Sequence, residues 1–285
     1  MLCGAFVDLR ALCVSRVDFV GLEADVIYHT VDGAGPPLLL LNGIAMSAPS
    51  WRPVAEPLAE SFTVIRCDLR GQLLSPGSPP ADIAEHVVDV AEVLDHLGLD
   101  SAHVLATSFG GAVGALFAAH QPDRVRSLLS IASSDGFIDV MATEVVRWRE
   151  ATVRSLEGPD RGVLSDILEP VVYSPAYIEA HREERVLRRK QIAALPTAWF
   201  EGLVGLLDSA ESFSLRSELG AISCPTLVAA AELDGFIPLE RCRGLAEAIP
   251  GAEFRVIKGA GHAVVVEQPE NIVDLAFEFF GTASH

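Results

Sequence analysis

Residues 101–120 read Ser-Ala-His-Val-Leu-Ala-Thr-Ser-Phe-Gly-Gly-Ala-Val-Gly-Ala-Leu-Phe-Ala-Ala-His, and this stretch decides the fold class. A short apolar run at 103–105 leads into small residues around Ser108, and a helical pattern of apolar residues follows. Strand, sharp turn and helix in this order are the setting of a nucleophile elbow, which lifts a serine hydroxyl above the end of a parallel sheet. Its flanks must be small because strand and helix nearly touch, and Ala106 and Gly110 are small. The alternative is that Ser108 only caps the helix.

The composition describes a globular chain that repels polyanions. Half of the 285 residues are hydrophobic, so a large core can be buried. The net charge is −18, which argues against nucleic acid and anionic membrane surfaces as partners. The five cysteines are scattered without metal-ligand spacing, so we expect a cytoplasmic protein without disulfides or a zinc site. The first fifteen residues lack the features of a signal peptide, and no stretch reaches the roughly 20 apolar residues of a membrane span.

Strand and helix patterns alternate along most of the chain, which predicts an α/β protein with a doubly wound, mostly parallel, eight-stranded sheet. Residues 17–31 alternate loosely between apolar and polar, and predict two antiparallel edge strands. The other six strands are short apolar runs expected at 38–41, 63–67, 103–105, 125–132, 226–231 and 253–257. Between residues 137 and 219 the strand-like runs give way to helices. So long an insertion predicts a helical lid, 137–219, on a core domain formed by residues 1–136 and 220–285.

Three residues stand in loops directly after predicted parallel strands: Ser108, Asp234 and His262. Such loops emerge at the same edge of the sheet, so distant positions can converge there. A serine hydroxyl needs a base to take its proton, and a neutral imidazole suits that role near pH 7. The imidazole in turn needs a carboxylate on its other nitrogen. The order Ser, Asp, His is typical of this architecture, so we predict a catalytic triad.

The simpler interpretations of the same residues are local. An aspartate after a strand often caps the next helix, and a histidine after Gly-Ala-Gly can simply fill a turn. Asp135, which follows the strand before the lid, is a second candidate for the triad acid. Of the two we favour Asp234.

Several motifs together resemble the α/β-hydrolase fold superfamily, in its serine-nucleophile branch. They are Leu41-Asn42-Gly43, Asp68-Leu69-Arg70-Gly71, Ala106-Thr107-Ser108-Phe109-Gly110-Gly111, Glu232-Leu233-Asp234 with Pro238, and Gly261-His262. The resemblance implies an oxyanion hole formed by the backbone N–H groups of Ile44 and Phe109. The chain departs from the family pattern at Asn42, where histidine is usual, and at Ala106 and Leu73, where glycine is usual.

The resemblance also implies a reaction class. We expect a serine hydrolase that cleaves a carboxylic ester through an acyl-enzyme, similar to carboxylesterases. A lactonase or a C–C bond hydrolase on the same triad is the alternative, and a hydrolase-like small-ligand receptor is the non-enzymatic one. We expect no cofactor and no metal.

The lid composition suggests what the substrate is like. Its large apolar residues imply a small, mainly apolar ester or acyl substrate. Trp148, Trp199 and Phe200 are the candidate substrate contacts, although the simpler interpretation of any one of them is that it belongs to the core of the lid itself. A homodimer is kept as the alternative to a monomer.

Overall fold

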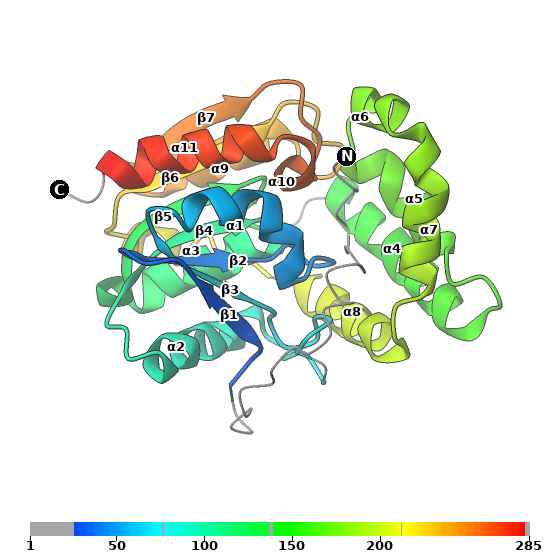
Figure 1. Cartoon of the computed structure of the whole chain (residues 1–285), viewed down its shortest axis with the longest axis horizontal. Coiled ribbons are helices and arrows are strands. Elements are labelled where there is room, and N and C mark those ends of the chain that lie inside the picture. The colour runs from blue at the N-terminus through cyan, green and yellow to red at the C-terminus, as the bar shows by residue number, and fades with distance from the viewer. Residues whose placement is uncertain (1–25, 76, 137–138, 212, 283–285) are drawn as a thin grey trace.

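The computed structural model describes residues 26–75, 77–136, 139–211 and 213–282 (Figure 1). Its centre is a seven-stranded sheet with the order β1-β3-β2-β4-β5-β6-β7. The strands are β1 His29–Asp32, β2 Pro37–Leu41, β3 Thr63–Cys67, β4 Ala102–Thr107, β5 Val125–Ile131, β6 Thr226–Ala231 and β7 Glu253–Ile257. β1 runs antiparallel to β3, whereas all other neighbours are parallel. The predicted doubly wound, mostly parallel sheet is confirmed.

The strand count differs from the prediction at one edge of the sheet. Eight strands are expected from the sequence, two of them within residues 17–31, and the described chain has seven. β1 accounts for one of the two, shifted to His29–Asp32. The other falls on residues 17–25, which lie outside the described residues.

Helices cover both faces of the sheet because its strands are apolar on both sides. In β2, Leu38 and Leu40 join one core cluster while Leu39 and Leu41 join the other, as the alternation of a strand requires. Figure 1 shows α1 and α11 on one face and α2 and α3 on the other. The helices of this layered core are α1 Arg52–Leu58, α2 His86–His96, α3 Phe109–His120, α9 Leu239–Ala248, α10 Val264–Glu267 and α11 Pro269–Thr282.

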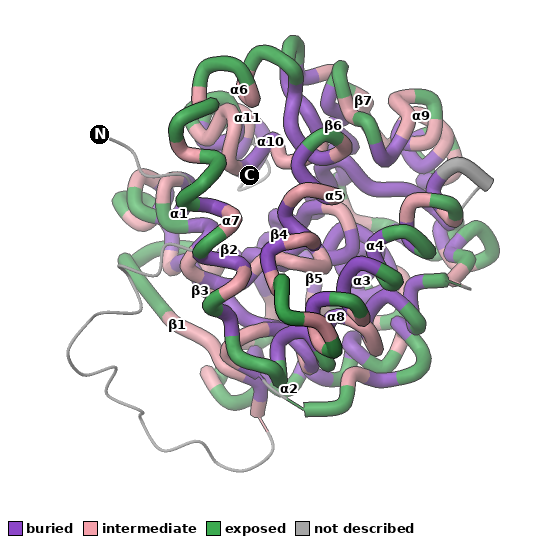
Figure 2. Tube along the Cα trace, turned by 90° about the vertical axis from the view of Figure 1, so that its right-hand side faces the viewer, coloured by how far each residue is buried: buried purple, intermediate pink, exposed green. Residues whose placement is uncertain are grey.

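Five further helices stand between β5 and β6 in the sequence and are called the α4–α8 segment below. They are α4 Asp139–Glu157, α5 Val163–Val172, α6 Pro175–Ala180, α7 Arg185–Ala193 and α8 Thr197–Ala210. α4 packs against both α5 and α8, and the segment stands to one side of the sheet in Figure 1. Burial follows the strands and the inward sides of the helices, while most turns are exposed (Figure 2). None of the helices in the described chain has the length and apolar character needed to cross a bilayer.

Candidate active site

Ser108 lies on the turn between β4 and α3 with a backbone φ of 54°. A positive φ is unfavourable for a residue with a Cβ, and such strain concentrates at functional sites. Its side chain makes no capping hydrogen bond to α3, so helix capping does not explain this serine. The turn is tight, because a Cβ on Gly110 would lie 2.5 Å from the carbonyl oxygens of Leu41 and Asn42. Ala106 is not among the residues with positive φ, so it replaces the usual glycine without strain.

His262 joins Ser108 to Asp234 through two hydrogen bonds. Its Nε2 lies 2.9 Å from Ser108 Oγ, and its Nδ1 lies 2.8 Å from Asp234 Oδ2. An aspartate carboxylate accepts hydrogen bonds, so Nδ1 donates and Nε2 is left to accept from the serine hydroxyl. The side chain of Asp234 is 1% exposed and that of His262 is 10% exposed, which shields this hydrogen-bonded series from competing water. The structure therefore brings together the three residues that the sequence singles out.

The second oxygen of the Asp234 carboxylate is held by the backbone. Its Oδ1 accepts from the N–H groups of Phe236 and Ile237, at 2.8 and 2.7 Å. The simpler interpretation, that Asp234 only caps the next helix, is wrong: α9 begins at Leu239 with Pro238 as its N-cap, and Asp234 Oδ1 instead holds the turn before that helix. Holding Oδ1 in this way directs Oδ2 at the imidazole.

Asp135, the second candidate for the acid, faces other partners. Its Oδ1 accepts from Arg241 at 2.6 Å and its Oδ2 from Arg216 at 2.8 Å. The carboxylate is 3% exposed, and both of its oxygens are occupied by these guanidinium groups. The structure therefore assigns the partner of His262 to Asp234.

The two predicted oxyanion donors stand on either side of Ser108. Phe109 is the first residue of α3, so its N–H has no acceptor within the helix. Ile44 lies in the loop that follows β2, and both residues line one cavity together with Ser108. Their role as an oxyanion hole stays a prediction from the sequence.

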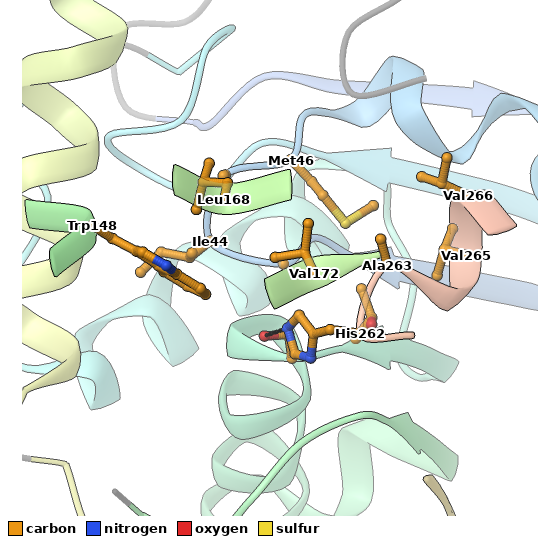
Figure 3. A pocket seen from close by; sticks show the side chains of 13 residues that line it. Ile44, Met46, Trp148, Leu168, Val172, His262, Ala263, Val265 and Val266 are labelled. Atoms are coloured by element: carbon orange, nitrogen blue, oxygen red, sulfur yellow. Dashed lines mark hydrogen bonds between the residues drawn. The ribbon is translucent and has the colours of Figure 1, made fainter. Parts of the chain in front are cut away.

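Two apolar cavities meet at Ser108. The first holds about 580 Å³ of empty space including its open mouth, and is lined by Met46, Trp148, Leu168, Val172 and His262 among others. Figure 3 shows Trp148 at one end of this cavity and Val265 and Val266 at the other. The second cavity lies toward Met141, Leu207 and Phe236. Both include Ile44, Ser108 and Trp148 in their walls.

Comparison with known proteins agrees with this geometry. A family model described as alpha/beta hydrolase fold matches residues 36–269. The chain belongs to this family. It is 33% identical over 270 residues to a protein from Azorhizobium caulinodans named as a carbamate hydrolase, RutD, covering 92% of this chain and 97% of that protein. It is also 28% identical to the pimeloyl-[acyl-carrier protein] methyl ester esterase of Aeromonas salmonicida, over 87% of this chain and 97% of that one.

A solved structure extends the likeness to three dimensions. MGS-M2, an alpha/beta hydrolase enzyme from a deep-sea metagenome library of the Medee basin, superposes with a TM-score of 0.83. The two chains are 25% identical, and the match covers 90% of this chain and 94% of that one. The expected family and the expected serine-type hydrolase are thereby confirmed.

Of the three aromatic residues expected to contact substrate in this hydrolase, the structure places one at the serine. Trp148 lines both cavities. Trp199 and Phe200, on α8, are 4% and 0% exposed and are not among the residues that line either cavity. Their rings pack edge to face, and the guanidinium of Arg161 lies over Phe200. Sequence alone could not separate these roles, because all three are large aromatic residues on helices.

A buried polar network lies beside the loop that carries Ile44, and it was not predicted from the sequence. Asn42 donates to the side-chain oxygens of Asp68 and Gln72, at 3.0 and 2.9 Å, and accepts from the indole N–H of Trp51 at 2.8 Å. Gln72 Nε2 then donates to the carbonyl of Gly43 at 2.9 Å. The amide of Asn42 thus takes up the position where the family usually has histidine, and its partners fix the loop that carries Ile44.

Asp68 is the charged member of this network. It is fully buried and accepts from Ser47, Ala48 and Leu74 as well as from Asn42. Burial nevertheless raises the pKa of this carboxyl above its ordinary value, because the hydrogen bonds offset only part of the desolvation cost. The signal that could have revealed this role is the motif Asp68-Leu69-Arg70-Gly71-Gln72 itself, which follows a buried strand next to β2.

Proposed function

We propose that this hydrolase cleaves a carboxylic ester or a related acyl bond of a small, mainly apolar substrate, with Ser108, His262 and Asp234 as its catalytic triad. The observation that carries the proposal is the pair of hydrogen bonds from Ser108 Oγ to His262 Nε2 and from His262 Nδ1 to Asp234 Oδ2. A hydroxyl in contact with a basic nitrogen, itself oriented by a carboxylate, is an activated nucleophile.

The reaction follows from these positions. Ser108 Oγ attacks the scissile carbonyl carbon while His262 Nε2 takes the hydroxyl proton, and Asp234 stabilises the imidazolium. The carbonyl oxygen becomes an oxyanion that accepts from the N–H groups of Ile44 and Phe109. Collapse breaks the bond to the alcohol oxygen, which leaves with the proton from His262, and an acyl-enzyme remains. Water then repeats the sequence and releases the acid.

The α4–α8 segment supports a further part of this proposal. Trp148, Leu168 and Val172 all belong to it and line the cavity at Ser108. We therefore assign residues 137–219 as a lid over the serine and residues 1–136 and 220–285 as the core domain. A lid with an apolar inner surface excludes water from the acyl-enzyme and holds the apolar part of the substrate.

The names of the relatives support the acyl-transfer class more than any one substrate. One is named for a carbamate and another for a methyl ester, and both bonds are cleaved by attack on a carbonyl carbon. A lactonase or C–C bond hydrolase would use the same triad. The three described cysteines are free thiols, which suits the cytoplasmic location that we propose. We assume that the site is complete in one chain, whether or not the protein forms a homodimer.

The test is turnover of p-nitrophenyl butanoate combined with labelling by a fluorophosphonate at pH 8. Ser108 should carry the label in a one-to-one ratio, and Ser108→Ala should abolish both labelling and turnover. Ser155→Ala serves as the matched control, because its hydroxyl donates to the carbonyl of Ala151 within α4 and lies outside both cavities. A label on another residue, or no adduct at all, would refute the assignment. Binding of small ligands without turnover of any ester, lactone or vinylogous diketone would indicate a receptor.

A further inference from the structure

Trp148 occupies a position that no other described side chain of the α4–α8 segment shares. It lies on α4 and lines both cavities that meet at Ser108. In Figure 3 its indole extends from α4 toward Ile44 and His262. A group bound at the serine can therefore meet this ring from either cavity.

Aromatic contacts hold the indole of Trp148 in place. Its ring packs on Phe236 with a centroid distance of 4.4 Å and an interplanar angle of 36°. Phe236 in turn meets the imidazole of His262 edge to face at 5.2 Å. The indole is thus part of a packed series that ends on the proposed catalytic base, so its orientation is set before a substrate arrives.

The indole N–H of Trp148 has no hydrogen-bond partner within the described part of the chain. Nε1 is buried and unpaired, and the whole residue is 4% exposed. A buried indole N–H usually finds an acceptor, as that of Trp51 does with Asn42 Oδ1 at 2.8 Å. Leaving such a donor without an acceptor is unfavourable, so an acceptor brought by a ligand would be bound strongly.

The serines in the wall of the second cavity and the proposed catalytic pair already have hydrogen-bond partners of their own. In the wall of the second cavity, Ser133 Oγ donates to the carbonyl of Ser108 at 2.9 Å and Ser134 Oγ to that of Gly136 at 3.1 Å. The hydroxyl of Ser108 and the imidazole of His262 are hydrogen-bonded to each other. The indole N–H of Trp148 therefore differs from these groups, because it is buried near the serine and has no hydrogen-bond acceptor among the described residues.

We propose that the indole N–H of Trp148 recognises the substrate, and that the natural substrate carries a second acceptor oxygen a few bonds from the scissile carbonyl. This inference rests on the proposed function and narrows it. The substrate class becomes oxygenated esters, such as keto, alkoxy or dicarbonyl compounds, in place of plain alkyl esters. The rest of the substrate is apolar, because the other side chains around the indole are largely aliphatic or aromatic.

The experiment compares esters that match in chain length and differ in one oxygen. Methyl hexanoate is paired with methyl 3-oxohexanoate and methyl 5-oxohexanoate for the acyl side, and butyl butanoate with 2-methoxyethyl butanoate for the alcohol side. The specificity constant kcat/KM is measured for the wild type, for Trp148→Phe and for Trp199→Phe. Phenylalanine keeps an aromatic ring against Phe236 but has no N–H. Trp199 is the matched control, being equally buried in the same segment but outside both cavities.

In the wild type, at least one oxygenated ester should exceed its plain partner in kcat/KM by about 10- to 100-fold. Trp148→Phe should bring that ratio close to one, whatever its effect on the plain ester, and Trp199→Phe should preserve the ratio. The inference is wrong if no oxygenated ester is preferred by the wild type, or if Trp148→Phe slows plain and oxygenated esters equally. Absence of all turnover together with an unlabelled Ser108 would instead refute the proposed function, and this inference with it.

Discussion

The backbone N–H of Ala263 donates to the carbonyl of Val172 at 2.7 Å, which ties the loop of His262 to the end of α5. On the other side of His262, the N–H of Gly261 donates to Glu267 Oε1 at 3.2 Å. The same oxygen accepts from the N–H of Ser174 at 2.8 Å. The histidine is therefore bracketed by two links to the α4–α8 segment, so the proposed lid also holds the proposed base in position.

Glu267→Ala should lower kcat by about 10- to 100-fold with little change in KM, because His262 loses one of these two links and drifts from Ser108. Glu267→Gln keeps a side-chain acceptor and should restore most of the rate. Glu270→Ala, at an exposed neighbouring position, is the control. Steady-state kinetics on one ester measure all three, and equal rates for alanine and wild type would mean that the Ala263–Val172 bond is sufficient.

Asp234→Asn should reduce kcat by about 10³- to 10⁴-fold, because an amide no longer stabilises the imidazolium of His262. Asp135→Asn should leave kcat within about tenfold of the wild type, since Asp135 contacts Arg216 and Arg241 and not the histidine. Its effect should appear instead as a lower unfolding temperature. Kinetics and thermal unfolding of both variants distinguish these outcomes, and a reversed pattern would assign the acid to Asp135.

Gln72→Leu should weaken oxyanion stabilisation without affecting ground-state binding. Gln72 holds the carbonyl of Gly43, so its loss frees the loop that presents the Ile44 N–H. We expect kcat to fall about 10- to 100-fold, less than for complete loss of a donor, with KM nearly constant. The inhibition constant of an alkyl boronic acid, which forms a tetrahedral adduct on serine, should rise in parallel. A rise in KM alone would contradict a role in the transition state.

His103 should make the protein less stable as the pH falls below neutrality. It is 2% exposed on β4, and burial lowers its pKa from 6.5 to about 4. Between these two pH values His103 is protonated in the unfolded chain but neutral in the folded chain. The free energy of unfolding is therefore undiminished by His103 above pH 6.5, and it decreases as the pH falls toward 4. The loss is at most about 3 kcal/mol.

Urea unfolding at pH 7.5 and pH 4.5 measures this effect. His103→Gln should show a smaller drop between the two pH values than the wild type does. His96→Gln, at an exposed position on α2, should behave like the wild type. If the free energy of unfolding has the same pH dependence in all three proteins, His103 does not control the loss of stability at low pH.

Much of the site could be predicted from the sequence because each part follows a local rule. The small residues around Ser108 are required by the close approach of α3 to the end of β2, whatever the rest of the chain does. Ser108, Asp234 and His262 each follow a parallel strand, and parallel strands end at one edge. Their convergence is therefore a consequence of chain order and sheet topology.

Other features depended on partners that are distant in sequence. Asp135 and Asp234 both follow strands, and what separates them is that Arg216 and Arg241 bind the first while His262 binds the second. Gln72 has no catalytic signature of its own, and it acquires a role only because β3 lies beside β2.

The sequence by itself determined the tight turn at Ser108, the order of the three proposed triad residues and the layered α/β core, because strand periodicity and small-residue turns are properties of neighbouring positions. Only the tertiary structure decided which aromatic residue reaches the serine. Trp148, Trp199 and Phe200 are all apolar residues on amphipathic helices, and sequence spacing does not say whether a buried face meets another helix or a cavity. That choice depends on how α4 and α8 pack, and of these three residues the packing places only Trp148 in the walls of the cavities at Ser108.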